Sequence, residues 1–152
     1  MKKFIILLGI FGASCKMNGQ GSGLPSQRPA DFTIQYHYDG GMRYYSEDIN
    51  IVADSCTYNV NDAGKITHHV FKLSTVELDD LYALLKKNQF DKIAYRTEEN
   101  VYDRGGISID VAWNKGMKYV NVSDAQRSFI KEGWQKEWAA VVNAVEALAK
   151  SK

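Results

Sequence analysis

The stretch STVELDDLYALLKKNQFDKI, residues 74–93, decides how the chain folds. Ser74 and Glu77 have the spacing of a reciprocal capping box, in which the serine oxygen accepts from the Glu77 amide and the carboxylate accepts from the Ser74 amide. A helix is therefore expected to begin at Thr75. Its apolar residues recur every three or four positions, which places them along one side of the helix. They are Leu78, Leu81, Tyr82, Leu84 and Leu85.

The end of this helix is also marked in the sequence. Lys86 and Lys87 occupy the last turn, where basic residues complement the helix dipole. Asn88 is expected to end the helix in the left-handed conformation, after which Phe90 and Ile93 fold back onto the apolar side. A helix of about four turns cannot bury such a side alone, so a sheet is needed beneath it.

The rest of the sequence supplies the alternation of apolar and polar residues that is typical of strands. Before the helix this pattern covers 31–38, 45–53, 56–60 and 66–73, and after it 107–113 and 117–122. The side that 66–73 presents to the core is left open, because Ile66, His68 and Val70 compete with Phe71 and Leu73.

A second helix is expected near the end of the chain, after a polar stretch at 94–103 that is expected to be loop. Its apolar residues again have helical spacing: Trp134, Trp138, Val141, Val142, Val145 and Leu148. The two tryptophans are interpreted as helix core rather than as a platform for a ligand. The sequence thus predicts one α+β domain over 31–150, with an antiparallel sheet of about six strands in the order ββββ-α-ββ-α and both helices on one face.

The amino terminus has the pattern of an export signal. Lys2 and Lys3 precede an apolar run at 4–11, and small residues then lead to Cys15. Such a run is too short to serve as a permanent membrane span. Residues 1–14 are therefore predicted to be a signal peptide. The following residues, 15–30, are rich in Gly, Ser, Gln and Pro and are predicted to be a flexible tether.

The residues at the end of this signal, Gly12, Ala13, Ser14 and Cys15, resemble the lipobox of bacterial lipoproteins. The resemblance implies that the Cys15 thiol carries lipid and anchors the chain to a membrane of the bacterial cell envelope, on its periplasmic or cell-surface side. The alternative is an ordinary secretory signal, which leaves Cys15 free or paired with Cys56. Without that pairing, Cys56 is expected to be a small core residue.

Composition and motifs give no indication of catalysis. With 152 residues, 24% of them charged, and a formal net charge of +1, the chain offers no argument for binding nucleic acid. His37, His68 and His69 lack the spacing of metal ligands, and neighbouring histidines on a strand point to opposite faces. Neither a phosphate-binding P-loop nor a G-x-S-x-G nucleophile motif is present.

Carboxylates do cluster in the sequence, but within or beside the expected loop: Glu98, Glu99, Asp103 and Asp110. General acid and base catalysis needs a pair of groups held in one cleft with shifted pKa values, which a solvated loop does not provide. The chain is therefore predicted to be no enzyme and to need neither metal nor cofactor. A hydrolase that uses Asp103 or Asp110 is the least favoured hypothesis.

The segment YHYDGGMRYY, 36–45, is the best candidate for a binding loop. Tyrosine and arginine are enriched at binding hot spots, because they combine a large contact area with a polar group. The candidate residues are Tyr36, Tyr38, Gly40, Gly41, Met42, Arg43, Tyr44 and Tyr45. In the alternative interpretation, Tyr36 and Tyr38 belong to the core face of their strand. The favoured hypothesis is a lipid-anchored module that binds an envelope protein.

The order of elements resembles that of small bacterial envelope proteins of unassigned role. It is also similar to that of emfourin, an inhibitor of thermolysin-like metalloproteases, in which the first strand likewise runs into a Gly-Gly loop. Gly40 and Gly41 carry this second resemblance. It implies an alternative function, in which the loop at 36–45 enters the cleft of a protease.

Overall fold

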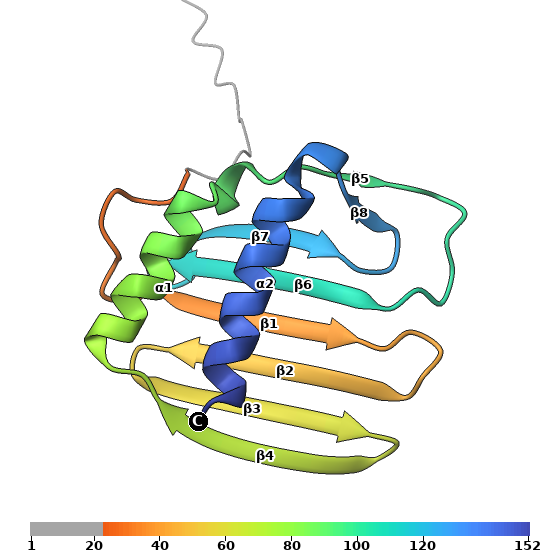
Figure 1. Ribbon diagram of the computed structural model, residues 1–152, viewed down its shortest axis with the longest axis horizontal. Coiled ribbons are helices and arrows are strands. Elements are labelled where there is room, and N and C mark those ends of the chain that lie inside the picture. Colours follow the sequence, from red (N-terminus) through yellow and green to blue (C-terminus); the bar gives the residue numbers. More distant parts are fainter. Residues whose placement is uncertain (1–22) are drawn as a thin grey trace, which may run out of the picture.

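The computed structural model describes residues 23–152 (Figure 1). The expected signal peptide, Cys15 and the tether up to residue 22 lie outside the described residues. The first half of the described chain contains β1 (Thr33–Asp39), β2 (Tyr45–Val52), β3 (Ser55–Asp62), β4 (Lys65–Lys72), α1 (Thr75–Lys87) and the short 3-10 helix η1 (Phe90–Lys92). The second half contains β5 (Tyr95–Thr97), β6 (Gly106–Trp113), β7 (Lys118–Asp124), β8 (Ser128–Ile130), η2 (Glu132–Trp134) and α2 (Gln135–Lys150).

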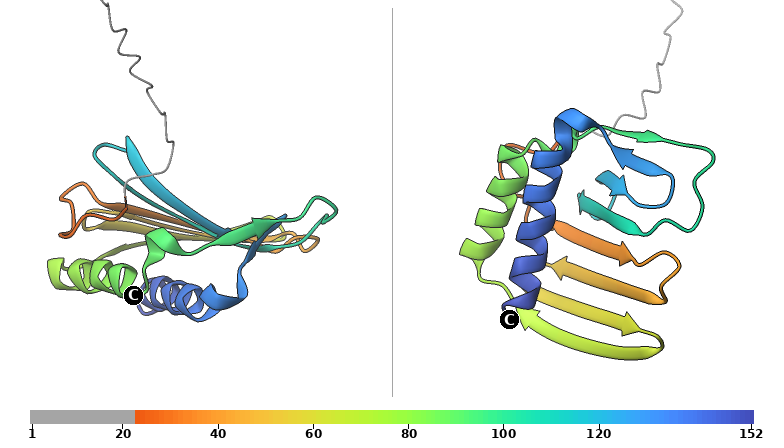
Figure 2. Two further views of the ribbon diagram at one scale, coloured as in Figure 1. Left: turned by 90° about the horizontal axis from the view of Figure 1, so that it is seen from above. Right: turned by 45° about the vertical axis from the view of Figure 1, so that its right-hand side comes forward.

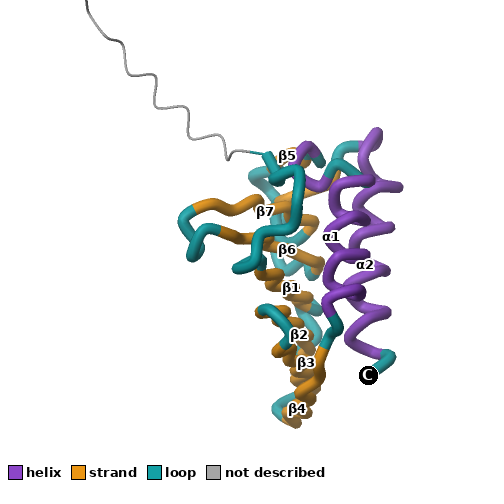
Figure 3. The backbone as a smooth tube through the Cα atoms, turned by 90° about the vertical axis from the view of Figure 1, so that its left-hand side faces the viewer, coloured by secondary structure: helices purple, strands orange, loops and turns teal. Residues whose placement is uncertain are grey.

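The main sheet has six antiparallel strands in the order β4-β3-β2-β1-β6-β7. Strands β1 to β4 form a meander, in which β1 pairs with β2 on one side. β6, from the β6–β7 hairpin, pairs with the other side of β1, so β1 lies in the interior of the sheet. Both helices cover the same face, and the other face is open (Figures 2 and 3). The predicted α+β architecture is confirmed.

The expectation that 94–103 is entirely loop is wrong. β5 pairs with β8 in a second sheet of two strands, with Tyr95 opposite Ile130 and Thr97 opposite Ser128. All three residues of β5 are exposed, so this strand has no alternating pattern that a sequence could reveal. Its position depends on a partner more than thirty residues further along the chain.

The core lies between the covered face and the two helices. β1 contributes Phe32, just before the strand, with Ile34 and Tyr36, as its alternation predicted. β4 contributes only Phe71, and its other seven residues are exposed. The question of which side of β4 faces the core is thereby settled: Phe71 faces the helices, and Ile66, His68 and Val70 lie on the open face.

Helix α1 begins at Thr75, as the capping box predicted. The Glu77 amide donates to Ser74 Oγ at 3.2 Å, and the Ser74 amide donates to Glu77 Oε2 at 2.8 Å. The prediction for Asn88 is wrong by one residue: its φ is −88°, and Gln89 has the positive φ of 48°. Asn88 keeps its helix-like conformation because both its backbone and side-chain nitrogens donate to the Leu84 carbonyl.

The end of the expected tether is part of the fold. Leu24 is buried, and its carbonyl accepts from Lys86 Nζ at 2.8 Å. The Pro25 carbonyl accepts from the Tyr82 hydroxyl, also at 2.8 Å. The folded unit therefore includes residues from Leu24 onward, rather than beginning at residue 31. The composition of this segment concealed the contact, because Leu24 is a lone apolar residue among Gly, Ser and Pro.

Candidate binding surface

The hairpin that joins β1 to β2 is held by its own backbone. Gly40 N donates to the Tyr45 carbonyl at 2.8 Å, and Gly41 N donates to Asp39 Oδ1, also at 2.8 Å. Gly41 has a φ of 64°, a conformation that is unfavourable for residues with a side chain. The Gly-Gly pair therefore forms a defined turn.

A second loop, 98–105, packs directly against this turn. A Cβ atom on Gly41 would lie 2.6 Å from both the Asp103 carbonyl oxygen and the Gly105 nitrogen. A Cβ atom on Gly105 would likewise collide with the Asp39 carbonyl oxygen. Glycine at both positions lets the two loops approach each other, so the loops form one surface.

Several large side chains project from these two loops into solvent. Met42 is 87% exposed, Tyr44 70% and Tyr102 73%. The Arg43 guanidinium lies 5.0 Å from the centre of the Tyr45 ring, and Arg127 lies 5.8 Å from the centre of the Tyr102 ring. Arg127 comes from the turn between β7 and β8. We call these exposed residues, Met42, Arg43, Tyr44, Tyr102 and Arg127, the loop-end surface.

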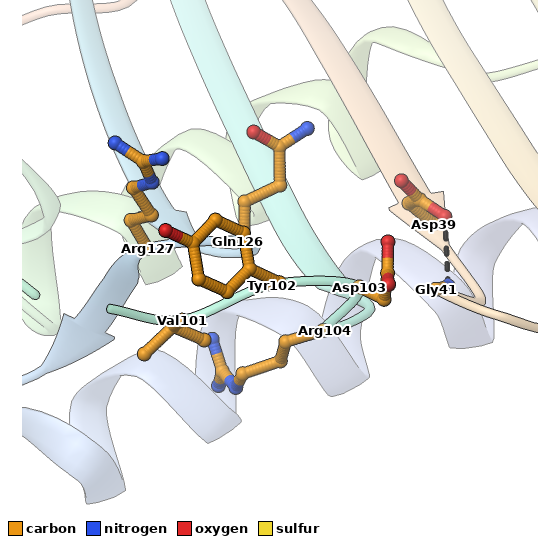
Figure 4. Close-up of a pocket in the computed structure, with 8 residues that line it drawn as sticks. All are labelled: Asp39, Gly41, Val101, Tyr102, Asp103, Arg104, Gln126 and Arg127. Atoms are coloured by element: carbon orange, nitrogen blue, oxygen red, sulfur yellow. Dashed lines mark hydrogen bonds between the residues drawn. The ribbon is translucent and has the colours of Figure 1, made fainter. Parts of the chain in front are cut away.

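Two shallow hollows flank the Gly41 turn and share Asp39 and Gly41. The first, of about 280 Å³, is lined by Asp39, Gly41, Val101, Tyr102, Asp103, Arg104, Gln126 and Arg127 (Figure 4). The second, of about 250 Å³, is lined by His37, Asp39, Gly41, Arg43, Tyr44, Tyr45, Ser46 and Asn61. Both mix acidic, basic and aromatic side chains, and this composition suits contact with a protein surface.

Side chains on neighbouring strands hold the first hollow in place. Arg104 donates to Asp124 Oδ1 at 2.7 Å and to the Ser128 carbonyl at 2.8 Å. Its guanidinium also lies 4.2 Å from the centre of the Phe129 ring. Arg104 is thus fixed by β7 and β8, whereas Arg127 extends toward Tyr102 at the surface (Figure 4).

Not all the predicted loop residues reach this surface. Tyr36 is 2% exposed and donates its hydroxyl to Glu146 Oε1 of α2 at 2.6 Å, so it belongs to the core. Tyr38 is half-buried, with its ring 5.9 Å from the ring of Tyr45. Sequence reasoning missed Tyr102 and Arg127, because their place beside the Gly41 turn depends on the pairing of β1 with β6 and of β6 with β7.

Sequence reasoning also missed a buried polar cluster under the end of α2. Glu47 is 8% exposed and accepts from the Tyr45 hydroxyl at 2.6 Å and from the Tyr58 hydroxyl at 2.8 Å. Lys150 Nζ lies 3.5 Å from Glu47 Oε2 and 2.9 Å from Glu146 Oε2. Alternation with Ile49 and Ile51 on β2 was the signal that could have placed Glu47 on the covered face.

The electrostatics of this cluster indicate a structural role. Burial raises the pKa of Glu47, but hydrogen bonds from Tyr45 and Tyr58 and the charge of Lys150 outweigh it and leave the pKa below its usual value. Burial and the bond to Glu146 raise the pKa of Tyr36. Among residues 23–152, every buried side-chain nitrogen and oxygen has a hydrogen-bond partner. The cluster fastens α2 to β2.

The other candidate ionisable residues are spread over the molecule. Asp110 lies on the open face of β6 and accepts from Asn121 Nδ2 at 2.9 Å, whereas Asp103 lines the first hollow. Glu98 is paired with Arg96 at 2.9 Å. Within the described part of the chain, no group of three or more His, Cys, Asp or Glu residues is placed to hold a metal ion. The Cys56 thiol is buried, and burial raises its pKa.

Together, the fold and this geometry define a two-layer α+β domain in which two interlocked loops expose large side chains at one end of the sheet. The chain matches no protein-family model, and no curated protein is found to be similar to it. Over residues 23–152, neither helix has the length and apolar character needed to cross a membrane.

Proposed function

We propose that the chain is a binding module, held at the bacterial cell envelope by a lipid on Cys15, that contacts a protein partner through the loop-end surface. The observation that carries the proposal is the exposure of Met42, Tyr44 and Tyr102 on two loops that are locked together. Arginine, methionine and aromatic side chains are the types enriched at protein interfaces.

Rigidity of the loops supports this assignment. A loop that is ordered before binding loses less conformational entropy on association, so more of its contact energy appears as affinity. The Gly40–Tyr45 and Gly41–Asp39 hydrogen bonds hold the turn, and the close packing of Gly41 against Gly105 holds the second loop against it.

The place where the amino-terminal segment enters the domain also supports the proposed role of the loop-end surface. Leu24 contacts α1 through Lys86, and the segment that leads from it to β1 lies at the end of the sheet where β1 begins (Figure 1). The Gly41 turn follows the opposite end of β1. A lipid on Cys15 would therefore attach to the domain away from its loop-end surface. That arrangement leaves Met42 and Tyr44 free to meet a partner while the module stays at the membrane.

A matched pair of double variants tests the proposal. The first, Met42→Ala with Tyr44→Ala, removes the centre of the loop-end surface. The second, Met117→Ala with Tyr119→Ala, removes the same two residue types from the β6–β7 hairpin, where Met117 is 72% exposed and Tyr119 61%. Each full chain is purified from its own envelope by mild detergent extraction, and the recovered partner is quantified against the unaltered chain.

We expect the first double variant to lose the partner and the second to retain it. Equal recovery with both variants would contradict the role of the loop-end surface. The Cys15→Ala chain tests the anchor separately, because it is expected to appear in the soluble fraction with its loops intact. A Cys15→Ala chain that remains in the membrane fraction would contradict the lipid anchor.

A second candidate function is inhibition of a thermolysin-type metalloprotease. It is favoured by the projection of Met42, Arg43 and Tyr44 from a turn that its own backbone holds, because such a loop can enter a cleft without ordering first. The test is titration of the purified chain into a thermolysin-type enzyme. Activity that is unchanged at micromolar concentrations of the chain would eliminate this candidate.

A further inference from the structure

The edge strand β4 is the most exposed strand of the main sheet. It pairs only with β3, and its outer edge has no partner among the described residues. Ile66 is 72% exposed and Val70 64%. An edge of this kind presents unpaired backbone donors and acceptors, which can bind another strand.

β4 has few of the features that usually protect an edge. Its pairing with β3 runs unbroken from Asp62 opposite Lys65 to Ser55 opposite Lys72, so no bulge twists the edge away. The strand contains neither proline nor glycine, and lysine occurs only at its two ends. A regular edge of eight residues is therefore available along its whole length.

The side chains of β4 are complementary to those of a second, antiparallel β4. When a two-fold axis perpendicular to the sheet passes through His68, Ile66 lies opposite Val70 of the second copy, and Val70 opposite Ile66. On the covered face, Thr67 then lies opposite His69, and Lys65 opposite Phe71. Directly opposed residues in antiparallel strands point to the same side, so the two exposed apolar residues meet.

Other symmetric registers lose this match. With the axis at His69, Ile66 lies opposite Lys72, and with the axis at Thr67 it lies opposite His68. With the axis at Ile66 or at Val70, that residue meets its own copy, but the other one lies opposite Asp62 or Ser74. The register centred on His68 is therefore the one that places both Ile66 and Val70 opposite apolar side chains. It also keeps every lysine away from the lysines of the other strand, which avoids like-charge repulsion.

We infer that β4 is a dimerisation edge, at which two copies of this chain pair through antiparallel β4 strands with His68 on the two-fold axis. The two main sheets then join into one continuous sheet, with the helices of both copies on the same face. The loop-end surface includes no residue of β4. The inference of a dimer therefore goes beyond the proposed function and does not depend on it.

Cysteine cross-linking tests the register directly. In antiparallel strands, directly opposed Cα atoms are about 4.5–5.5 Å apart, which is within the range that a disulfide spans. The variants are made in a full chain with Cys15→Ala, so that the remaining natural thiol is the buried Cys56. Under mild oxidation, His68→Cys is expected to form a covalent dimer.

Two controls fix the register. Thr67→Cys is expected to cross-link no more than the Cys15→Ala parent, because Thr67 lies opposite His69. Ile66→Cys and Val70→Cys are each expected to fail alone and to cross-link when the two variants are mixed. Equal cross-linking of His68→Cys and Thr67→Cys would overturn the inference.

Sedimentation of the Cys15→Ala chain without added cysteines gives an independent measurement. We expect the mass of a dimer, and we expect Val70→Lys to weaken dimerisation by roughly tenfold or more, because both Ile66–Val70 pairs are lost. A monomeric mass at the highest concentration measured would overturn the inference. So would a different protein found along β4 in place of the second copy.

Discussion

The covered face of the sheet and its loop end differ in what their tyrosines do. On the covered face, Tyr36, Tyr45 and Tyr58 direct their hydroxyls to Glu146 or Glu47. The Tyr36–Glu146 bond and the Lys150–Glu47 ion pair fasten α2 to the strands. At the loop end, Tyr44 and Tyr102 point into solvent. The tyrosines thus differ by their place in the fold: those on the covered face of the strands bond to carboxylates, and those in the loops are exposed.

The largest effect is expected in the core. Phe32 is 1% exposed, and its ring lies 5.1 Å from that of Tyr82. Phe32→Ala should lower the free energy of unfolding by about 3–5 kcal/mol, because it removes buried contacts and leaves a cavity. Val76→Ala, at a position that is 67% exposed, is the control and should change it by less than about 1 kcal/mol. Urea denaturation measures the free energy of unfolding of both variants, and similar losses in the two would contradict the placement of the core.

The buried polar cluster should show the next effect. Glu47→Ala removes the acceptor of two partly buried tyrosine hydroxyls and leaves Lys150 without this partner, so it should cost about 1–3 kcal/mol. The exposed Glu99 is the matched control, and Glu99→Ala should cost less than about 0.5 kcal/mol. Equal denaturation midpoints for the two variants would show that Glu47 does not fasten α2.

The contact between the two loops can be broken at Gly105. Gly105→Ala places a methyl group against the Asp39 carbonyl and should cost roughly 1–3 kcal/mol through overpacking. It should also reduce partner recovery, since the loop-end surface then loses its alignment. Gly64→Ala is the control for recovery, because no atom lies within 4 Å of its added Cβ, although its positive φ of 88° itself carries strain. Full recovery of the partner with Gly105→Ala would show that binding does not depend on the contact between the two loops.

These expectations also show what the sequence could reveal. The cap of α1 and the strand alternation depend on neighbours within a few residues, so they were predicted correctly. Leu24 and the β5–β8 pair depend on partners distant in sequence, so local patterns did not reveal them. Glu47 was missed although its alternation with Ile49 and Ile51 is a local pattern, because a charged residue is not expected on the covered face. The loop-end surface was half predicted: Met42 and Tyr44 come from the Gly-Gly loop, whereas Tyr102 arrives through β6.

The smallest effect concerns pH and the cap of α1. A hydrogen bond from Lys152, with further bonds from the Ser74 amide and hydroxyl, lowers the pKa of Glu77 to about 2. Because this value lies below the usual 4.5, the carboxylate stabilises the fold above pH 4.5, and the contribution is lost as the pH falls toward 2. Glu77→Gln should flatten the dependence of the melting temperature on pH in that window. An unchanged slope would contradict the role of Glu77.

The most direct test of the account is site-specific photo-cross-linking in living cells. A photoreactive phenylalanine analogue replaces Tyr44 in one full-length chain and Tyr119, on the β6–β7 hairpin, in another. The account predicts that illumination joins a protein partner to the chain labelled at position 44 and leaves the chain labelled at position 119 without it. Partner capture at position 119 alone, or equal capture at both positions, would contradict the claim that the loop end is the binding surface.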